Sequence, residues 1–108
     1  MISIDDFKKI EIKIGQILSA EKVEDTDKLL KLSVDFGEEA PRQIISGISS
    51  YFEDTKDLVG RKCAFATNLE PRTIKGLESQ GMILAVSGDN FFSLLEVSVK
   101  VLPGSPIR

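Results

Sequence analysis

Apolar and polar side chains alternate along several stretches of this chain. Over one stretch apolar residues occupy every second position, at Leu30, Leu32, Val34 and Phe36. Because successive side chains of a strand point to opposite faces, a period of two predicts a half-buried β-strand. Ile10, Ile12 and Ile14 show the same period. The chain must therefore bury several half-apolar strands against one another.

Gly15 interrupts the first of these strands. A glycine inside a long strand often marks a bulge or sharp bend, which lets one strand serve two sides of a barrel. Leu18 and Ala20 keep the parity of the preceding isoleucines, so we expect both side chains to face the interior.

Further strands follow, separated by turn signals. Apolar content predicts them at residues 42–48, 62–67, 80–86 and 91–101. A hairpin loop is expected at residues 37–41 and a tight turn at residues 87–90. The polar segment from Phe52 to Leu58 predicts a short helix that ends near Gly60. Asn68 to Glu78 is expected to form a polar loop.

The order of three strands, a short helix and two or more further strands is the layout of an OB-fold. That fold is a five-stranded Greek-key barrel, which binds oligonucleotides with the face of strands 2 and 3 and with loops. The 108 residues fit one all-β domain, residues 1–108, with a C-terminal extension. SH3-like barrels and small sandwiches remain alternatives on the pattern alone.

The N-terminus carries a helix signal of its own. Ser3 followed by Asp6 resembles a capping box, which predicts a helical turn up to about Lys9. A single turn is too short to be stable alone. We therefore expect it to pack on the barrel as a lid, with Ile4 and Phe7 inward.

Composition argues against catalysis. Histidine is absent, so the commonest general base and metal ligand is missing. Cys63 lies in an apolar strand, which predicts a small buried residue rather than a nucleophile. Glu24, Asp25 and Asp27 lack the ligand order of an EF-hand and are expected to form a solvated turn. We expect no enzyme activity, no cofactor and no metal site.

The same composition indicates where the protein works. No stretch reaches the roughly 18 apolar residues that a membrane helix needs, and the N-terminus has no apolar signal-peptide core. A single cysteine cannot form an internal disulfide, which fits a reducing compartment. We expect a cytoplasmic protein without a membrane partner.

Charge is distributed unevenly along the chain. The totals are 14 basic and 17 acidic residues, a net charge of −3, whereas dedicated phosphate binders are usually basic. The segment from Arg61 to Lys75 carries four basic residues against Glu70 alone. An RNA site is a local patch, so this segment matters more than the net charge.

The segment from Asn68 to Met82 is the first candidate for binding RNA. Arg72 and Lys75 supply donors to phosphates, while Ser79 offers hydrogen bonds to base edges or riboses. Met82 offers a soft apolar surface to a base. On composition alone, an ordinary polar surface loop is the better explanation.

Two shorter stretches are weaker candidates. Lys28 and Lys31 flank the start of the alternating strand, and Lys31 lies on the nucleic-acid side of the barrel if it faces outward. Alternation alone makes solvated positions the simpler explanation for both. Ser46 with Gly47 could form the floor of a nucleotide site or simply end a strand.

Five blocks in this order resemble the tRNA-binding domain family. They are residues 5–15, 27–32, 43–48 and 68–82 and the closing Pro103-Gly104-Ser105. The family includes the C-terminal domain of bacterial methionyl-tRNA synthetases, free-standing structure-specific tRNA-binding proteins and the endothelial monocyte-activating polypeptide domain. The resemblance runs from about Ile4 to Ile107.

The resemblance implies an OB-fold that binds tRNA by shape, near its outer corner, with little sequence preference and no catalysis. It also implies a homodimer and a link to methionyl-tRNA synthetase, either as an appended module or as a free-standing protein. By matching position, the implied tRNA contacts are Lys28, Lys31, Ser46, Asn68, Lys75, Ser79 and Met82, with Arg72 as a looser match.

Two departures from the family pattern make the surface more acidic. They are the turn from Val23 to Thr26 and Glu70, which stands where relatives usually carry a basic residue. The acidic balance keeps open a protein-interaction or chaperone-like module on the same fold. A C-terminal apolar run exceeds what one small barrel needs and predicts dimerisation; it comprises Leu94, Leu95, Val97, Val99, Val101 and Leu102.

Overall fold

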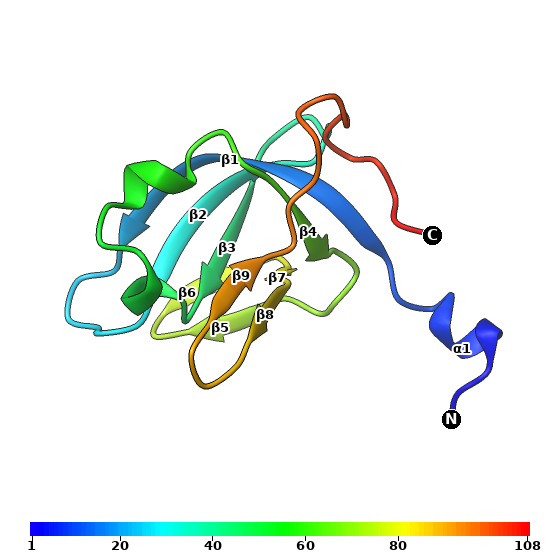
Figure 1. Cartoon of the computed structure of the whole chain (residues 1–108), viewed down its shortest axis with the longest axis horizontal. Helices are drawn as coiled ribbons and strands as arrows, with labels where there is room; N and C mark the ends of the chain where they lie inside the picture. Colours follow the sequence, from blue (N-terminus) through cyan, green and yellow to red (C-terminus); the bar gives the residue numbers. More distant parts are fainter.

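One long strand organises the molecule. β1 (Ile12–Lys22) pairs antiparallel with β2 (Leu30–Asp35) and, through its first half, with β4 (Lys62–Ala66). β3 (Arg42–Ser46) adds to β2 and β7 (Met82–Ile83) adds to β4, which gives the order β3-β2-β1-β4-β7. In this computed structural model of residues 1–108 the sheet curls into a nearly closed barrel (Figure 1). The predicted all-β, OB-like fold is confirmed.

β1 can serve both sides of the barrel because it is bulged. Its register against β2 shifts between Ile17 and Ser19, so the bulge lies at Leu18 rather than at Gly15. Ile17 is fully buried and Leu18 is 44% exposed. The expectation that Leu18 faces the interior is wrong, because Gly15 and Ile17 already face the core and Leu18 alternates with them; the bulge then turns Ala20 back toward the core. Ala20 packs against the core as expected.

The core is built from the alternating side chains of the barrel strands. Its largest fully buried members include Ile17, Leu30, Leu32, Val34, Ile44 and Phe65. Phe36 meets Phe65 edge-on, with ring centroids 5.1 Å apart. Cys63 is buried as predicted, and burial raises the pKa of its thiol to about 11. The thiol therefore stays protonated at neutral pH and is not an activated nucleophile.

The helical segments are short and partly differ from expectation. The predicted helix over residues 52–58 is replaced by two 3₁₀ turns, η1 (Ser49–Tyr51) and η2 (Thr55–Leu58). The second turn buries Leu58 against the core, and Gly60 follows it with a φ of 90°. No helix is long and apolar enough to span a membrane.

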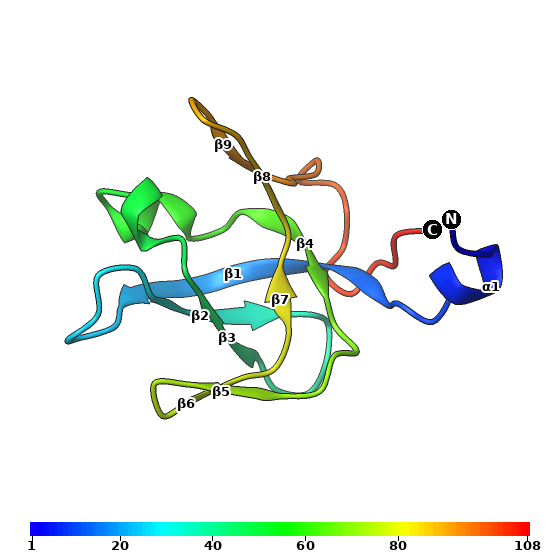
Figure 2. The same ribbon diagram turned by 90° about the horizontal axis from the view of Figure 1, so that it is seen from below.

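α1 (Ile4–Phe7) forms where the capping box predicts it. The Ser3 hydroxyl accepts a hydrogen bond from the Asp6 amide at 3.1 Å. The helix is not a lid, however, because it stands away from the barrel beside the C-terminus (Figures 1 and 2). Ile4 is 66% and Phe7 43% exposed, so the expectation that they point inward is wrong.

Two hairpins leave the barrel on opposite sides (Figure 2). β5 (Arg72–Ile74) and β6 (Leu77–Ser79) form the first, where a polar loop was expected. Its turn residues Lys75 and Gly76 both have positive φ, as a two-residue hairpin turn of type I′ requires. β8 (Ala85–Ser87) and β9 (Phe92–Leu94) form the second across the predicted turn. The strand expected at residues 80–86 is therefore split between β7 and β8.

Candidate nucleic-acid interface

The β5–β6 hairpin is fastened to the outer edge of β3, and this contact shapes the site. The Gln80 amide donates to the Gln43 carbonyl at 2.8 Å, and the Gln43 amide donates to Gln80 Oε1 at 3.0 Å. Gln43 Nε2 donates to the Glu78 carbonyl at 2.9 Å. Side chains thus complete a junction between β3 and the hairpin that lies outside the main sheet.

Ser79 forms the buried part of the same junction. Its side chain is 3% exposed, and its hydroxyl accepts from the Ile45 amide and donates to the Gly81 carbonyl, each at 2.9 Å. The hydroxyl that we expected to face RNA is therefore already bonded inside the protein.

Arg42 is a central residue of the junction and was not among the predicted RNA contacts. Its guanidinium donates to the two carboxylate oxygens of Glu38 at 2.8 and 2.7 Å. It also donates to the carbonyls of Thr67 at 2.7 Å and Gln80 at 3.2 Å. Hydrogen bonding lowers the pKa of Glu38 and raises that of Arg42. The sequence signal was weak, because Glu38 and Arg42 flank an ordinary hairpin loop.

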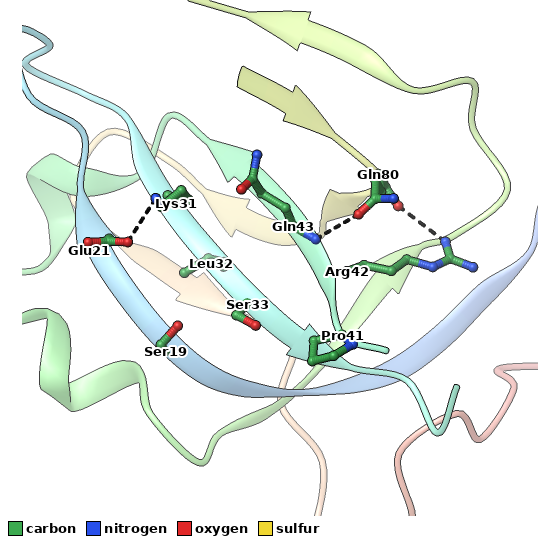
Figure 3. Close-up of a pocket in the computed structure, with 9 residues that line it drawn as sticks. All are labelled: Ser19, Glu21, Lys31, Leu32, Ser33, Pro41, Arg42, Gln43 and Gln80. Atoms are coloured by element: carbon green, nitrogen blue, oxygen red, sulfur yellow. Dashed lines mark hydrogen bonds and ion pairs between the residues drawn. The ribbon is translucent and has the colours of Figure 1, made fainter. Parts of the chain in front are cut away.

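A polar groove runs over the outer faces of β1, β2 and β3 (Figure 3). It encloses about 360 Å³, and its polar lining is Ser19, Glu21, Lys31, Ser33, Arg42, Gln43 and Gln80. Lys31 faces outward as the alternation predicts, but its ammonium lies 3.0 Å from the Glu21 carboxylate. The groove offers many hydrogen-bonding groups, and both of its cations are paired with carboxylates.

Lys28 and Lys75 come together from distant parts of the sequence. The β1–β2 loop, residues 23–29, lies beside the tip of the β5–β6 hairpin in both views (Figures 1 and 2). Together they line a hollow of about 370 Å³, hereafter the loop–hairpin hollow, made by Asp25, Thr26, Asp27, Lys28, Leu29, Ile74 and Lys75. Neither lysine takes part in an ion pair. Both ammonium groups are free to meet an anion.

Arg72 and Met82 lie on a third, smaller surface. They line a hollow of about 40 Å³ together with Ser79 and Glu70. Arg72 is exposed and outside every ion pair, and Met82 is 44% exposed. Glu70, the acidic departure from the family pattern, therefore lines the same hollow as the free cation Arg72.

Ser46 and Asn68 lie outside these three surfaces. Ser46 ends β3 opposite Leu30. Asn68 ties the chain after β4 to the N-terminal segment, because its Oδ1 accepts from the Glu11 amide at 2.8 Å and its Nδ2 donates to the Lys9 carbonyl at 2.7 Å. The predicted site residues thus do not form one cluster: Lys28 lies with Lys75 in one hollow, and Arg72 lies with Ser79 and Met82 in another.

The chain is similar in sequence to known proteins. Residues 12–106 match the family model described as "Putative tRNA binding domain". Curated relatives are methionine–tRNA ligases, among them those of Methanoregula boonei, 51% identical over 108 residues, and Caldanaerobacter subterraneus, 43% identical over 106 residues. The chain is matched over 100% and 98% of its length, yet it spans only 16% of each relative.

Solved structures resemble the whole chain. A methionyl-tRNA-synthetase-related protein from Pyrococcus horikoshii has a TM-score of 0.92 and 36% identity, covering 100% of this chain and 98% of that one. The chaperone CsaA from Bacillus anthracis has a TM-score of 0.85 and 25% identity, covering 100% and 99% of the two chains.

Proposed function

Since this chain belongs to the tRNA-binding domain family, we propose that it binds tRNA by shape, with little sequence preference and no catalysis of its own. The convergence of the free cations Lys28 and Lys75 beside the polar groove carries this proposal. OB-folds bind oligonucleotides on the same face and with the equivalent loops, which supports it. The family and the fold narrow the ligand to a nucleic acid, and the lysines and polar side chains of the site provide the groups that bind it.

Binding of this kind works mainly through phosphates. Lys28, Lys75 and Arg72 meet the RNA backbone and release its condensed counterions, which makes affinity fall as salt rises. The polar groups of the groove, among them Ser33 and Gln43, contribute hydrogen bonds to riboses and base edges. Lys31, Ser46, Asn68, Ser79 and Met82 complete the proposed interface, with Ser79 and Asn68 acting as its internal supports.

The biological setting proposed is translation in the cytoplasm. The module works either appended to methionyl-tRNA synthetase or as a free-standing protein beside it. The relatives that match over this chain are methionine–tRNA ligases, which supports that link. A second tRNA contact on the synthetase raises its effective affinity without a new catalytic group.

A filter-binding titration at low salt tests the function. Labelled tRNA is expected to be retained in preference to a DNA duplex of equal length, and retention is expected to weaken as salt is added. Several unrelated tRNAs should bind with similar affinity. Absence of retention, or retention insensitive to salt, would overturn the proposal.

Dimerisation is proposed as part of this function. Exposed apolar side chains from both ends of the chain gather in one hollow of about 310 Å³, lined by Ile4, Phe7, Ile10 and Ile107. The C-terminal run adds Val99, 83% exposed, and Leu102, 71% exposed. Covering such surface with a second copy removes it from water.

A chaperone-like role is the second candidate. The resemblance to the chaperone CsaA over the full length of both chains favours it. A pull-down with unfolded peptides separates the two functions. Capture of peptides by a protein that fails to retain tRNA would favour this alternative.

A further inference from the structure

The loop–hairpin hollow has the features of a site for one nucleotide. We propose that it takes a single unpaired ribonucleotide of the RNA, with the phosphate between Lys28 and Lys75 and the base against Leu29 and Ile74. Carboxylates of Asp25 and Asp27 accept hydrogen bonds from the ribose 2′-hydroxyl or from base amino groups. This inference rests on the proposed tRNA binding and specifies which part of the RNA is held.

The loop wall of the hollow is held in place by internal hydrogen bonds. The Val23 amide donates to the Leu29 carbonyl at 3.1 Å and closes the loop, and Thr26 Oγ1 donates to the Val23 carbonyl at 2.8 Å. The Ser49 amide binds the Lys28 carbonyl at 2.9 Å from the other side. The main chain that carries Lys28 is thus fixed before any ligand arrives, which lowers the entropy cost of binding.

The hairpin wall is fixed in the same way. Ile74 pairs with Leu77 next to the turn, and Ser79 clamps the base of the hairpin to β3. Lys75 itself adopts a positive φ of 52° at the turn. Both walls therefore present their lysines from defined backbone positions on either side of one hollow.

The charge pattern favours a nucleotide over a simple anion. A site for any polyanion gains nothing from Asp25 and Asp27, because carboxylates repel phosphate. A ribonucleotide presents one anionic phosphate together with donors at its 2′-hydroxyl and on its base. Two free ammonium groups beside two carboxylates match that mixed pattern and penalise bare phosphates.

The volume and the apolar surface of the loop–hairpin hollow agree with a single nucleotide as its ligand. The volume of about 370 Å³ falls within the range of small-ligand sites, which is about 300–1,000 Å³. Leu29 and Ile74 are half-buried and give the hollow an apolar surface. A base in a duplex would first have to be unpaired and unstacked to reach such a surface, so the site favours unpaired nucleotides of loops and ends.

Nuclear magnetic resonance titration of the ¹⁵N-labelled protein tests the inference. The probes are single-stranded oligoadenylate RNA, the same sequence as DNA, a blunt RNA duplex and tripolyphosphate. Oligoadenylate RNA is expected to shift the amides of residues 25–29 and 74–76 and to bind about fivefold more tightly than each of the other probes. Equal binding of RNA and DNA strands, or shifts confined to the polar groove, would overturn it.

Variants assign the parts of the hollow. Ile74→Thr is expected to weaken oligoadenylate binding about fivefold, because it removes apolar contact while keeping a β-branched residue in the strand. The matched change Val86→Thr on the other hairpin is expected to leave binding unchanged. The pair Asp25→Asn and Asp27→Asn should erase the preference for RNA over DNA, and Asp89→Asn should not. Unchanged binding by Ile74→Thr would overturn the inference.

Filter binding of tRNA to the unmodified protein keeps the two proposals apart. If tRNA is retained while oligoadenylate leaves the loop–hairpin hollow unperturbed, the nucleotide site is wrong and the general function stands. If tRNA is not retained at all, both fall.

Discussion

At the scale of single residues, the proposed interface includes side chains that are bonded inside the protein. Matching by position placed Ser79 and Asn68 among the RNA contacts, yet each uses its polar group on main-chain partners. Position in a motif cannot distinguish a residue that touches RNA from one that holds the touching segment. Lys28 and Lys75 differ in this respect, because both are exposed and free of ion pairs.

Ser79→Ala tests the internal role of the hydroxyl. The change leaves the buried Ile45 amide without its acceptor, which is expected to destabilise the fold by about 1–3 kcal/mol. Urea denaturation measures the loss, with Ser87→Ala on the exposed strand β8 as the matched control. A variant that keeps full stability but loses tRNA binding would show instead that this hydroxyl contacts RNA directly.

The pair of Glu38 and Arg42 predicts a dependence of stability on pH. The hydrogen bond from Arg42 lowers the pKa of Glu38 below 4.5, so the carboxylate favours the folded state at neutral pH. That contribution is present above the unfolded value of 4.5 and is lost as the pH falls through the lowered folded value. The side chain is 39% exposed, which keeps the effect small.

Urea midpoints measured across this pH window check the effect. Glu38→Gln is expected to be less stable than the unmodified protein at neutral pH, and the difference should narrow on acidification. The neighbouring Glu39→Gln, which alters no ion pair, should show no such narrowing. A gap that stays constant with pH would contradict the role given to the pair.

At the scale of elements, alternation predicted the barrel strands well and the hairpin poorly. The strand from Leu30 has alternate side chains buried in a regular pattern, which sequence period captures directly. The β5–β6 hairpin has strands of three residues each, too short for a period to show. Its available signal was Lys75-Gly76 between Ile74 and Leu77, a two-residue turn between apolar residues. The hydrogen bonds between Gln43 and Gln80 join segments that are far apart in the sequence, so no local sequence pattern predicts them.

Gly15→Ala tests how β1 crosses the barrel. A Cβ at this position would lie 2.5 Å from Val34 Cγ1 and 2.6 Å from Phe36 Cε1, so these two side chains can pack against β1 there only because Gly15 has no side chain. The added methyl group is expected to cost about 1–3 kcal/mol through overpacking. Thermal or urea unfolding measures it.

Gly47→Ala is the matched control, because nothing lies within 4 Å of a Cβ built there. Its stability should stay within about 0.5 kcal/mol of the unmodified protein. Equal stability of the Gly15 and Gly47 variants would mean that Val34 and Phe36 can move aside to accommodate a methyl group on β1.

At the scale of the whole molecule, the apolar surface near the two termini predicts a dimer. Light scattering at micromolar concentration should report twice the 11.9 kDa of one chain. Phe7→Glu should shift the mass toward that of one chain, since it places a charge among Ile4, Ile10 and Ile107. Val59→Glu, at a comparably exposed apolar residue after η2, serves as the control. A monomeric unmodified protein would contradict the proposed dimer.

We propose that Lys28 and Lys75 together hold tRNA phosphates, and the dependence of tRNA affinity on salt concentration tests this role. The slope of log affinity against log salt is compared for the unmodified protein, the double variant Lys28→Ala with Lys75→Ala, and the control Lys56→Ala with Lys100→Ala. The slope is negative, and each lost phosphate contact reduces its magnitude by about 0.7–0.9. We predict that the magnitude of the slope falls by about 1.4–1.8 for the first double variant, one contact for each lysine, and stays unchanged for the control. Identical slopes for the unmodified protein and the Lys28 and Lys75 variant would show that these lysines do not hold tRNA phosphates.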